Sequence, residues 1–269
     1  MRRLQRLDAE LVRRGIARSR EHAVEMITSG RVQVRGVTAH KAATGVGPQV
    51  PIRVVVDPDD PGYASRGAHK LVGALLAFPS VAVAGRRCLD AGASTGGFSD
   101  VLLRAGAAEV IAVDVGYGQL AWAVRSDHRV RVMDRTNVRT LTPTAIGGPV
   151  DLVVADLSFI SLRIVLPALL SCAAPEADVL PMVKPQFEVG RDRLGSGGVV
   201  RDPKLWSQTV SEIARHAAEL GWPARGVARS PLPGPSGNVE FFLWLRRNGP
   251  PAIDDMTLER LVTTGQEAP

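Results

Sequence analysis

A glycine-rich run at residues 88–98, C-L-D-A-G-A-S-T-G-G-F, constrains the fold of this chain more than any other feature. The segment before it, residues 81–89, is mostly apolar and β-branched and predicts a strand. Apolar residues at helical spacing follow from Phe98 to Ala105 and predict a helix. Strand, glycine turn and helix form the first unit of a doubly wound α/β domain, in which a ligand binds at the carboxyl end of the strand.

The form of the turn indicates which ligand it accepts. A second apolar strand is predicted at residues 109–113 and is followed by Asp114, 24 residues after Asp90, where a carboxylate can accept hydrogen bonds from ribose hydroxyls. The turn reads D-x-G-x-x-x-G and lacks the G-x-G-x-x-G pattern, whose second glycine lets the backbone approach a pyrophosphate. S-adenosylmethionine has a sulfonium, a ribose and an amino-acid end but no phosphate, so the turn favours this cofactor over NAD. A glycine turn that serves only helix–strand packing is the alternative.

We therefore predict cofactor contacts along the turn and at the ends of the neighbouring strands. Asp134 follows a further short strand predicted at residues 129–133 and is a candidate for the adenine end of the cofactor, although a capped turn would also explain it. The predicted cofactor-binding residues are Asp90, Gly92, Ala93, Ser94, Thr95, Gly96, Gly97, Phe98, Asp114, Val115, Asp134 and Asp156.

Lysine is rare in this chain, and its few positions are informative. Of the 33 basic residues only four are lysine, and every other one is arginine. Arginine does not deprotonate in proteins, whereas lysine changes its pKa readily when it is desolvated or lies beside another cation. A retained lysine is therefore a candidate for chemistry that arginine cannot do. The four lysines are Lys41, Lys70, Lys184 and Lys204.

Four ionisable residues form a candidate set, and two of them, Asp156 and Lys184, are expected at the ligand edge of the predicted sheet. Asp156 and Lys184 end successive predicted strands, and Pro185 disfavours helix at Lys184. Lys70 lies at the start of a helix just before the first strand, and Glu240 opens a late strand. Each has a simpler explanation when taken singly: a helix cap for Asp156, a solvated helix face for Lys70 and a solvated strand charge for Glu240. The set as a whole favours a reaction centre.

This set, together with the glycine turn, resembles the Lys-Asp-Lys-Glu tetrad of the FtsJ-like ribose 2′-O-methyltransferases. The chain is more similar still to the TlyA family, some of whose members are labelled hemolysins, in the segments S-R-G-A-H-K-L, D-A-G-A-S-T-G-G-F, D-V-G-Y-G-Q-L, A-D-L-S-F-I-S, V-K-P-Q-F-E-V-G and P-G-P-S-G-N-V-E. The resemblance implies that the substrate is the ribose of a cytidine in ribosomal RNA. The small ribosomal subunit is the main candidate and the large subunit a further one. Methylation there would affect antibiotics that bind at the interface of the subunits. The resemblance also implies the catalytic residues Lys70, Asp156, Lys184 and Glu240.

The expected mechanism follows from the reactants. A ribose 2′-hydroxyl is a weak acid and a poor nucleophile, while a sulfonium methyl is already activated, so the protein mainly positions and polarises. We predict that Lys184 takes or shares the hydroxyl proton, with Lys70, Asp156 and Glu240 orienting and tuning it as one coupled set. The glycine-rich, charged segment at residues 186–202 is either a substrate lid or an ordinary surface loop.

Residues 1–57 account for the whole net positive charge. They contain 11 basic and 5 acidic residues, a net charge of +6 that equals the charge of the full chain. Such a concentration is the electrostatic footprint of a polyanionic partner. Helices are predicted at residues 4–14 and 20–28, the second with Ser19 as N-cap and Gly30 as C-cap.

The pattern L-D-x-x-L-x-x-x-G-x-A-x-S-R-x-x-A…I-x-x-G-x-V-x-V in this region resembles the alpha-L RNA-binding motif of the ribosomal protein S-four type. The alternative is a basic solvated face on a dimerisation module. The resemblance implies phosphate contacts by Arg6, Arg18, Ser19, Arg20 and Arg31.

Composition sets the broad class. A chain of 269 residues with 45% hydrophobic content can fill one large core and a small module. The family resemblances imply a Rossmann-like α/β domain, its sheet mostly parallel with an antiparallel last strand, and a small N-terminal α+β module. The expected domains are an RNA-binding domain at residues 1–57, a linker at 58–65, a methyltransferase domain at 66–248 and a C-terminal tail at 249–269.

Other classes of function fit less well. The sequence has no run of 18 or more apolar residues, so we expect no membrane span. The first residues do not resemble a signal peptide, and the two cysteines suit a reducing compartment. We therefore expect a cytoplasmic protein. The five histidines form no metal-binding pair, and no protein partner is inferable. Methyltransferases that act on exocyclic amines of bases usually carry Asn/Asp-Pro-Pro-aromatic where this chain has D-L-S-F. Those that act on cytosine carbon need a nucleophilic cysteine, usually after a proline, and neither Cys88, inside a predicted strand, nor Cys172, in S-C-A-A, fits. The remaining alternatives are a hemolysin or membrane-acting protein and a non-catalytic RNA-binding ribosome assembly factor.

Overall fold

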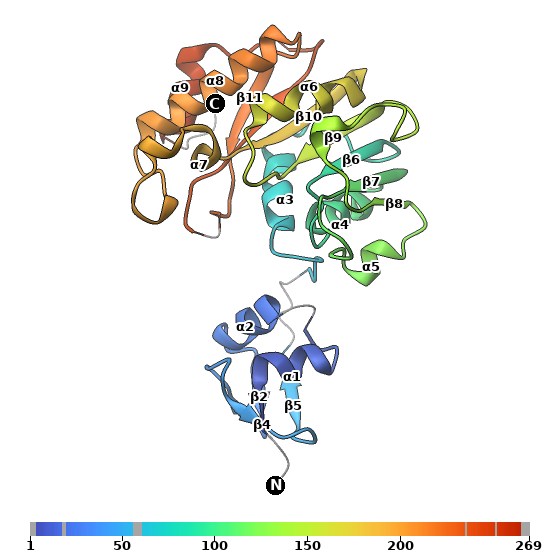
Figure 1. The fold of residues 1–269 in the computed structure, drawn as a ribbon, viewed down its shortest axis with the longest axis vertical. Helices are drawn as coiled ribbons and strands as arrows, with labels where there is room; N and C mark the ends of the chain where they lie inside the picture. Colours follow the sequence, from blue (N-terminus) through green and yellow to red (C-terminus); the bar gives the residue numbers. More distant parts are fainter. Residues whose placement is uncertain (1–3, 18–19, 56–60, 235, 251, 265–269) are drawn as a thin grey trace. The chain divides into compact units, whose positions relative to one another are not determined.

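The computed structural model describes residues 4–17, 20–55, 61–234, 236–250 and 252–264. The chain divides into two compact units, residues 1–65 and 66–269 (Figure 1).

The N-terminal unit is a small α+β fold. Two helices pack with a three-stranded sheet of order β3-β2-β5 and with the strand pair β1–β4 around a core that includes Leu7, Leu11 and Ile27. Its elements are β1 (Gln5–Arg6), α1 (Leu7–Arg13), α2 (Arg20–Thr28), β2 (Val32–Val34), β3 (Val37–Thr38), β4 (Gly45–Val46) and β5 (Ile52–Val54).

The two helix predictions for this unit had different outcomes. The helix at residues 20–28 is confirmed, and Gly30 ends it with a left-handed φ of +74°. The helix expected at residues 4–14 begins only at Leu7, because Gln5 and Arg6 pair with β4 instead. Ser19, the predicted N-cap, lies outside the described residues.

The second unit is built on a seven-stranded sheet of order β11-β12-β10-β9-β6-β7-β8. Strands β10, β9, β6, β7 and β8 are parallel, whereas β12 runs antiparallel to both of its neighbours. The predicted mostly parallel sheet with an antiparallel last strand is therefore confirmed. The strands are β6 (Arg87–Ala91), β7 (Glu109–Val113), β8 (Val130–Met133), β9 (Val150–Ala155), β10 (Ala173–Val183), β11 (Ala224–Arg229) and β12 (Phe241–Leu245).

The first strand is shorter than the sequence pattern predicts. Val81 and Val83 are buried as expected, but they lie outside any strand, and β6 begins at Arg87. Gly85, with a φ of +72°, interrupts the extended backbone, so apolar periodicity alone places the strand start too early.

Helices cover both faces of this sheet. Figure 1 shows α6, α8 and α9 on one side and α3 and α4 on the other, and the main core lies between the sheet and the first group. The helix α9, within the segment predicted as a tail, buries Leu258 and Val262 against this core. The helices are α3 (Ala68–Ala77), α4 (Gly97–Arg104), α5 (Trp122–Arg125), α6 (Leu162–Cys172), α7 (Pro185–Glu188), α8 (Pro203–Glu219) and α9 (Asp255–Thr264), with short 3-10 turns at Val138–Thr140, Arg191–Arg193 and Ser196–Gly198.

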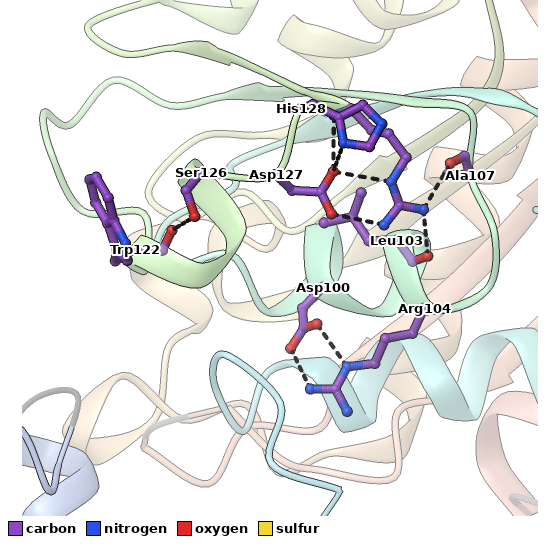
Figure 2. A network of polar contacts seen from close by, with 9 residues as sticks. Asp100, Leu103, Arg104, Ala107, Trp122, Ser126, Asp127 and His128 are labelled. Atoms are coloured by element: carbon purple, nitrogen blue, oxygen red, sulfur yellow. Dashed lines mark hydrogen bonds and ion pairs between the residues drawn. The ribbon is translucent and has the colours of Figure 1, made fainter.

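A polar network secures the β8 edge of the sheet to α4 (Figure 2). The guanidinium of Arg129, just before β8, donates to the Asp127 carboxylate and to the backbone carbonyls of Leu103 and Ala107 at the end of α4. Arg129 lowers the pKa of Asp127 to about 2, so this pair stays ionised at neutral pH. The network fastens the end of α4 to the start of β8, at the edge of the sheet opposite the glycine turn.

Candidate active site

The glycine turn folds as the pattern predicts. Gly92, Ser94 and Gly96 all have positive φ, at +88°, +48° and +93°. At Gly92 an added Cβ would lie 2.6 Å from the backbone oxygen of Asp156, so only glycine fits where β6 and β9 end side by side. At Gly96 it would lie 2.9 Å from Leu120. The turn is therefore fixed by close packing as well as by its left-handed backbone.

Asp114 organises the opposite side of this turn. Its carboxylate accepts hydrogen bonds from the backbone N–H of Ser94 at 2.8 Å and of Gly116 at 2.7 Å. The side chain remains half-buried at the wall of a cavity of about 480 Å³. The sequence predicts a ribose-binding carboxylate at the edge of the sheet after β7. Asp114 lies at that edge, and its side chain lines the cavity.

The cavity has a composition that suits a cationic ligand. Its volume lies in the range of ordinary cofactor sites, and among the described residues that line it there are two carboxylates and no lysine or arginine. A pyrophosphate would find no cation there, whereas a sulfonium and an ammonium would be attracted. The residues present therefore fit S-adenosylmethionine. The lining residues are Gly92, Ser94, Asp114, Val115, Gln119, Asn137, Val138, Asp156, Leu157, Ser158, Phe159, Ile160 and Val165.

Seven of the predicted cofactor-binding residues do not line this cavity. Asp90 is fully buried and accepts a hydrogen bond from Ser99 Oγ at 2.6 Å. Burial raises the pKa of its carboxyl group to about 7. Asp134 accepts from the backbone N–H of Gly118 and from Arg125, as a capped turn would. The others shape the turn and the start of α4: Ala93, Thr95, Gly96, Gly97 and Phe98.

The four residues of the predicted tetrad meet at the same edge of the sheet. Lys184 Nζ lies 2.5 Å from Asp156 Oδ1. Lys70 Nζ lies 2.5 Å from Glu240 Oε2 and 3.9 Å from Asp156 Oδ2. Two ammonium groups and two carboxylates thus alternate in one chain of contacts.

Sheet topology explains why residues so distant in sequence come together. Asp156 and Lys184 follow parallel strands β9 and β10, so both lie at the carboxyl edge. Glu240 precedes β12, and because β12 is antiparallel its beginning lies at that same edge, where Phe241 pairs with Val183. The simpler explanations for two of them are wrong, since Glu240 is 1% exposed and Lys70 8%.

A second cavity, of about 910 Å³, adjoins the tetrad. Lys184 and Glu240 line it, and Ser158, Phe159 and Ile160 line both this cavity and the first one. The two cavities therefore share a wall at the loop between β9 and α6. We call the first one the cofactor cavity and the second the substrate cleft.

Several residues at the site were not singled out from the sequence. Ser158 accepts a hydrogen bond from Lys184 Nζ at 2.9 Å, and Gln186 donates to Glu240 Oε1 at 3.0 Å. Phe159 is 91% exposed with a φ of +63°, and its ring centroid lies 5.1 Å from that of Phe187. Ser158 and Phe159 lie in the motif segment A-D-L-S-F-I-S, and Gln186 and Phe187 lie in V-K-P-Q-F-E-V-G. The motifs therefore mark these segments, but they do not indicate which side chains meet.

The segment at residues 186–202 is largely folded. It contains most of α7 and two 3-10 turns, and buried Val200 donates its N–H to Asn238 Oδ1 at 2.9 Å. Leu194 from this segment lines the substrate cleft. Its function as a lid stays a prediction.

In the N-terminal unit, buried Asp8 holds two of the predicted RNA-binding arginines. Arg6 and Arg20 donate to its carboxylate at 3.1 and 2.9 Å, while 52% and 61% of their side chains remain exposed. Arg6 is the main cause that lowers the pKa of Asp8 to about 2. Arg31 is half-buried, and the predicted residues Arg18 and Ser19 lie outside the described part of the chain.

The fold and the site define a Rossmann-like methyltransferase. The chain matches FtsJ-like methyltransferases over residues 63–247 and the S4 domain over residues 5–50. It is 62% identical over 262 residues to the 16S/23S rRNA (cytidine-2′-O)-methyltransferase TlyA of Mycobacterium tuberculosis, covering 97% of each chain. It is 32% identical to Hemolysin A of Brachyspira hyodysenteriae, covering 88% of this chain and 98% of that one.

A solved structure of a hemolysin-named protein from Streptococcus thermophilus superposes with a TM-score of 0.77 at 32% identity, covering 98% of this chain and 96% of that one. The chain belongs to the TlyA family of FtsJ-like methyltransferases. Within the described residues, no helix is both long and apolar enough to cross a membrane.

Proposed function

We propose that this protein transfers a methyl group from S-adenosylmethionine to the ribose 2′-oxygen of a cytidine in ribosomal RNA. The observation that supports this most directly is the position of the tetrad between the two cavities. Asp156 lines the cofactor cavity, Lys184 lines the substrate cleft, and the two side chains form an ion pair. A methyl donor on one side and a hydroxyl on the other would meet there. The name of the Mycobacterium tuberculosis relative is consistent with this substrate.

The cofactor would be held by the turn and by two carboxylates. Asp114 is placed to bind the ribose hydroxyls, and Asp156 adds a second negative charge to the wall. When bound, S-adenosylmethionine supplies an activated methyl group on a sulfonium. Of the predicted cofactor-binding residues, Gly92, Ser94 and Val115 would contact it directly, while the turn residues outside the cavity would hold the backbone in place.

The tetrad would handle the proton of the 2′-hydroxyl. Lys184 faces the substrate cleft with its Nζ held by Asp156 and Ser158, so its position is fixed before substrate binds. As the oxygen attacks the methyl group, a neutral amine at Lys184 would take the 2′-hydroxyl proton onto Nζ, whereas an ammonium would share the proton only by donating a hydrogen bond to that oxygen. Lys70, paired with Glu240, adds a second positive charge close to Asp156.

The N-terminal unit would supply RNA affinity. Arg6 and Arg20 are held in place by Asp8 yet stay exposed, and this arrangement suits contacts to phosphates. Ribosomal RNA is the polyanion that the family relationship favours, so we place the protein with the ribosome in the cytoplasm. Whether it acts on the small subunit alone or on both subunits is a separate question that the following experiment answers.

The test uses isolated ribosomal subunits lacking the modification. They are incubated with the full-length protein and labelled S-adenosylmethionine, and the modified nucleotide is mapped by its resistance to alkaline cleavage. We expect one labelled cytidine ribose per modified subunit, and no label with Lys184→Ala. Label on a base, or a wild-type protein that binds subunits without transferring methyl, would contradict the proposal, and the second result would favour a non-catalytic assembly factor.

A further inference from the structure

A glutamate outside both cavities joins the two loops that hold the catalytic pair. Glu188 is the last residue of α7, the single helical turn that starts directly after Lys184. Its carboxylate accepts hydrogen bonds from Ser161 Oγ at 2.6 Å and from the backbone N–H of Leu162 at 2.7 Å. Those two residues begin α6, which follows the loop after β9.

This contact completes the N-terminal cap of α6 from another part of the chain. Ser161 is the N-cap and accepts a hydrogen bond from the N–H of Arg163 at 3.2 Å. In a capping box the second acceptor is a Glu or Gln three residues later, but that position is Ile164 here. Glu188 instead accepts from the N–H of Leu162, the first residue of α6, and it does so from the segment that follows the catalytic lysine.

The loop it secures is the wall shared by the two cavities. Between Asp156 and Ser161 the chain passes through Phe159, a non-glycine residue with a φ of +63° and an almost fully exposed side chain. Such a conformation persists only where the surroundings enforce it. The cap at Ser161 and Leu162 fixes the chain two residues further on, so it restrains this strained segment.

Among the residues that the structure describes, the other contacts between the two loops lie within the site itself. They are the hydrogen bond from Lys184 to Ser158, the ion pair of Lys184 with Asp156 and the ring contact of Phe159 with Phe187. Substrate and cofactor would touch these groups, whereas Glu188 lines neither cavity. Its carboxylate can therefore restrain the loops throughout the reaction.

We propose that Glu188 is a positioning residue for methyl transfer, which fixes Lys184 relative to Asp156 by clamping α7 to the start of α6. Burial is the main cause that raises the pKa of Glu188, and the hydrogen bonds from Ser161 and Leu162 oppose it. Two charged side chains also act on it: Arg163 favours the ionised form and Glu212 opposes it. The inference rests on the proposed function, since it concerns the same reaction.

The test compares variants of the full-length protein in single-turnover methyl transfer to ribosomal subunits at saturating cofactor and RNA. Glu188→Ala should slow transfer about 10–100-fold, because both contacts are lost. Glu188→Gln should stay within about threefold of wild type, since its amide oxygen can accept from Leu162 N–H while its amide nitrogen donates to Ser161 Oγ. Ser161→Ala removes one of the two contacts to Glu188 together with the N-cap hydrogen bond from Arg163, at a residue that lines the substrate cleft, and it should fall between the two.

A matched control separates positioning from simple helix capping. Asp202 caps α8 by accepting from Lys204 N–H at 2.9 Å, away from both cavities. Asp202→Ala should lower the melting temperature much as Glu188→Ala does and leave the transfer rate within twofold of wild type.

Four results would overturn the inference. The first three are a wild-type rate for Glu188→Ala, a rate for Glu188→Gln as low as that for Glu188→Ala, and a rate loss in Asp202→Ala equal to that in Glu188→Ala. The fourth applies if Glu188→Ala does not fold: an unchanged rate in Ser161→Ala would then overturn the inference. A wild-type protein that transfers no methyl would instead refute the proposed function, and this inference with it.

Discussion

Replacing Lys184 by arginine tests whether the site needs a proton carrier or only a positive charge. The ammonium of Lys184 lies 2.5 Å from Asp156 and 2.9 Å from Ser158, and only 7% of its side chain is exposed. Arginine keeps the charge but is longer, planar and always protonated. It can neither give up a proton nor place a single nitrogen between the same two oxygens.

The expected loss can be scaled from the function assigned to the residue. A positioned acid–base group contributes about 10²–10⁴ in rate, which corresponds to about 3–5 kcal/mol of transition-state stabilisation. We therefore expect Lys184→Arg to lose about 10²–10⁴ in the transfer rate, nearly as much as Lys184→Ala. Cofactor affinity should change little, because Lys184 lines the substrate cleft and not the cofactor cavity.

The assay is single-turnover transfer of labelled methyl to ribosomal subunits, with cofactor affinity measured separately by calorimetry. Lys204→Arg is the matched control, since this lysine is exposed at the start of α8 and should tolerate the change within about twofold. A Lys184→Arg rate near that of wild type would show that the site needs only a cation, and the proton-transfer function of Lys184 would have to be abandoned.

Three further predictions concern the cofactor, the RNA and stability. Asp114→Ala should weaken S-adenosylmethionine binding about 10–100-fold, because each charge-assisted hydrogen bond contributes roughly 1.5–3 kcal/mol; unchanged affinity by calorimetry would refute the ribose assignment. Removal of residues 1–57 should abolish methylation of ribosomal subunits and preserve cofactor binding, and RNA binding by the full chain should fall steeply with salt; efficient methylation by the truncated protein would contradict this division of labour. Asp90 has an ordinary pKa of 3.8 and a folded-state pKa of about 7, so its contribution to stability is greatest below pH 3.8 and is lost as the pH rises through 7. Asp90→Asn should therefore raise the free energy of unfolding at pH 8, by up to about 4 kcal/mol, and a chemical denaturation series that shows no gain would disprove the assignment.

Much of the site follows from local sequence rules. The ends of parallel strands share one edge of a sheet, so Asp114, Asp156 and Lys184 could be placed there from apolar runs and a proline alone. Glu240 could be placed only through the family resemblance, because its position depends on the antiparallel direction of β12. Strand direction is decided by long-range pairing, which periodicity does not encode.

What the sequence missed depends on loop conformation and on contacts between distant segments. Gly85 stops β6 from starting at residue 81, and the pairing of Gln5 with Val46 delays the first helix. The contact of Glu188 with Ser161 joins residues 27 positions apart in two irregular segments. No pattern of spacing or propensity predicts such a contact, since it arises only once both strands are packed.

The wall that the cofactor cavity shares with the substrate cleft makes this protein a target for bisubstrate inhibitors. Ser158, Phe159 and Ile160 face both spaces, so a compound with one part in each would contact the same loop from two sides. Once one part has bound, the other part binds its site at an effective concentration that is set by the linker and not by the concentration of the compound in solution. Two weak fragments joined by a short linker across this loop should therefore bind far more tightly than either fragment alone.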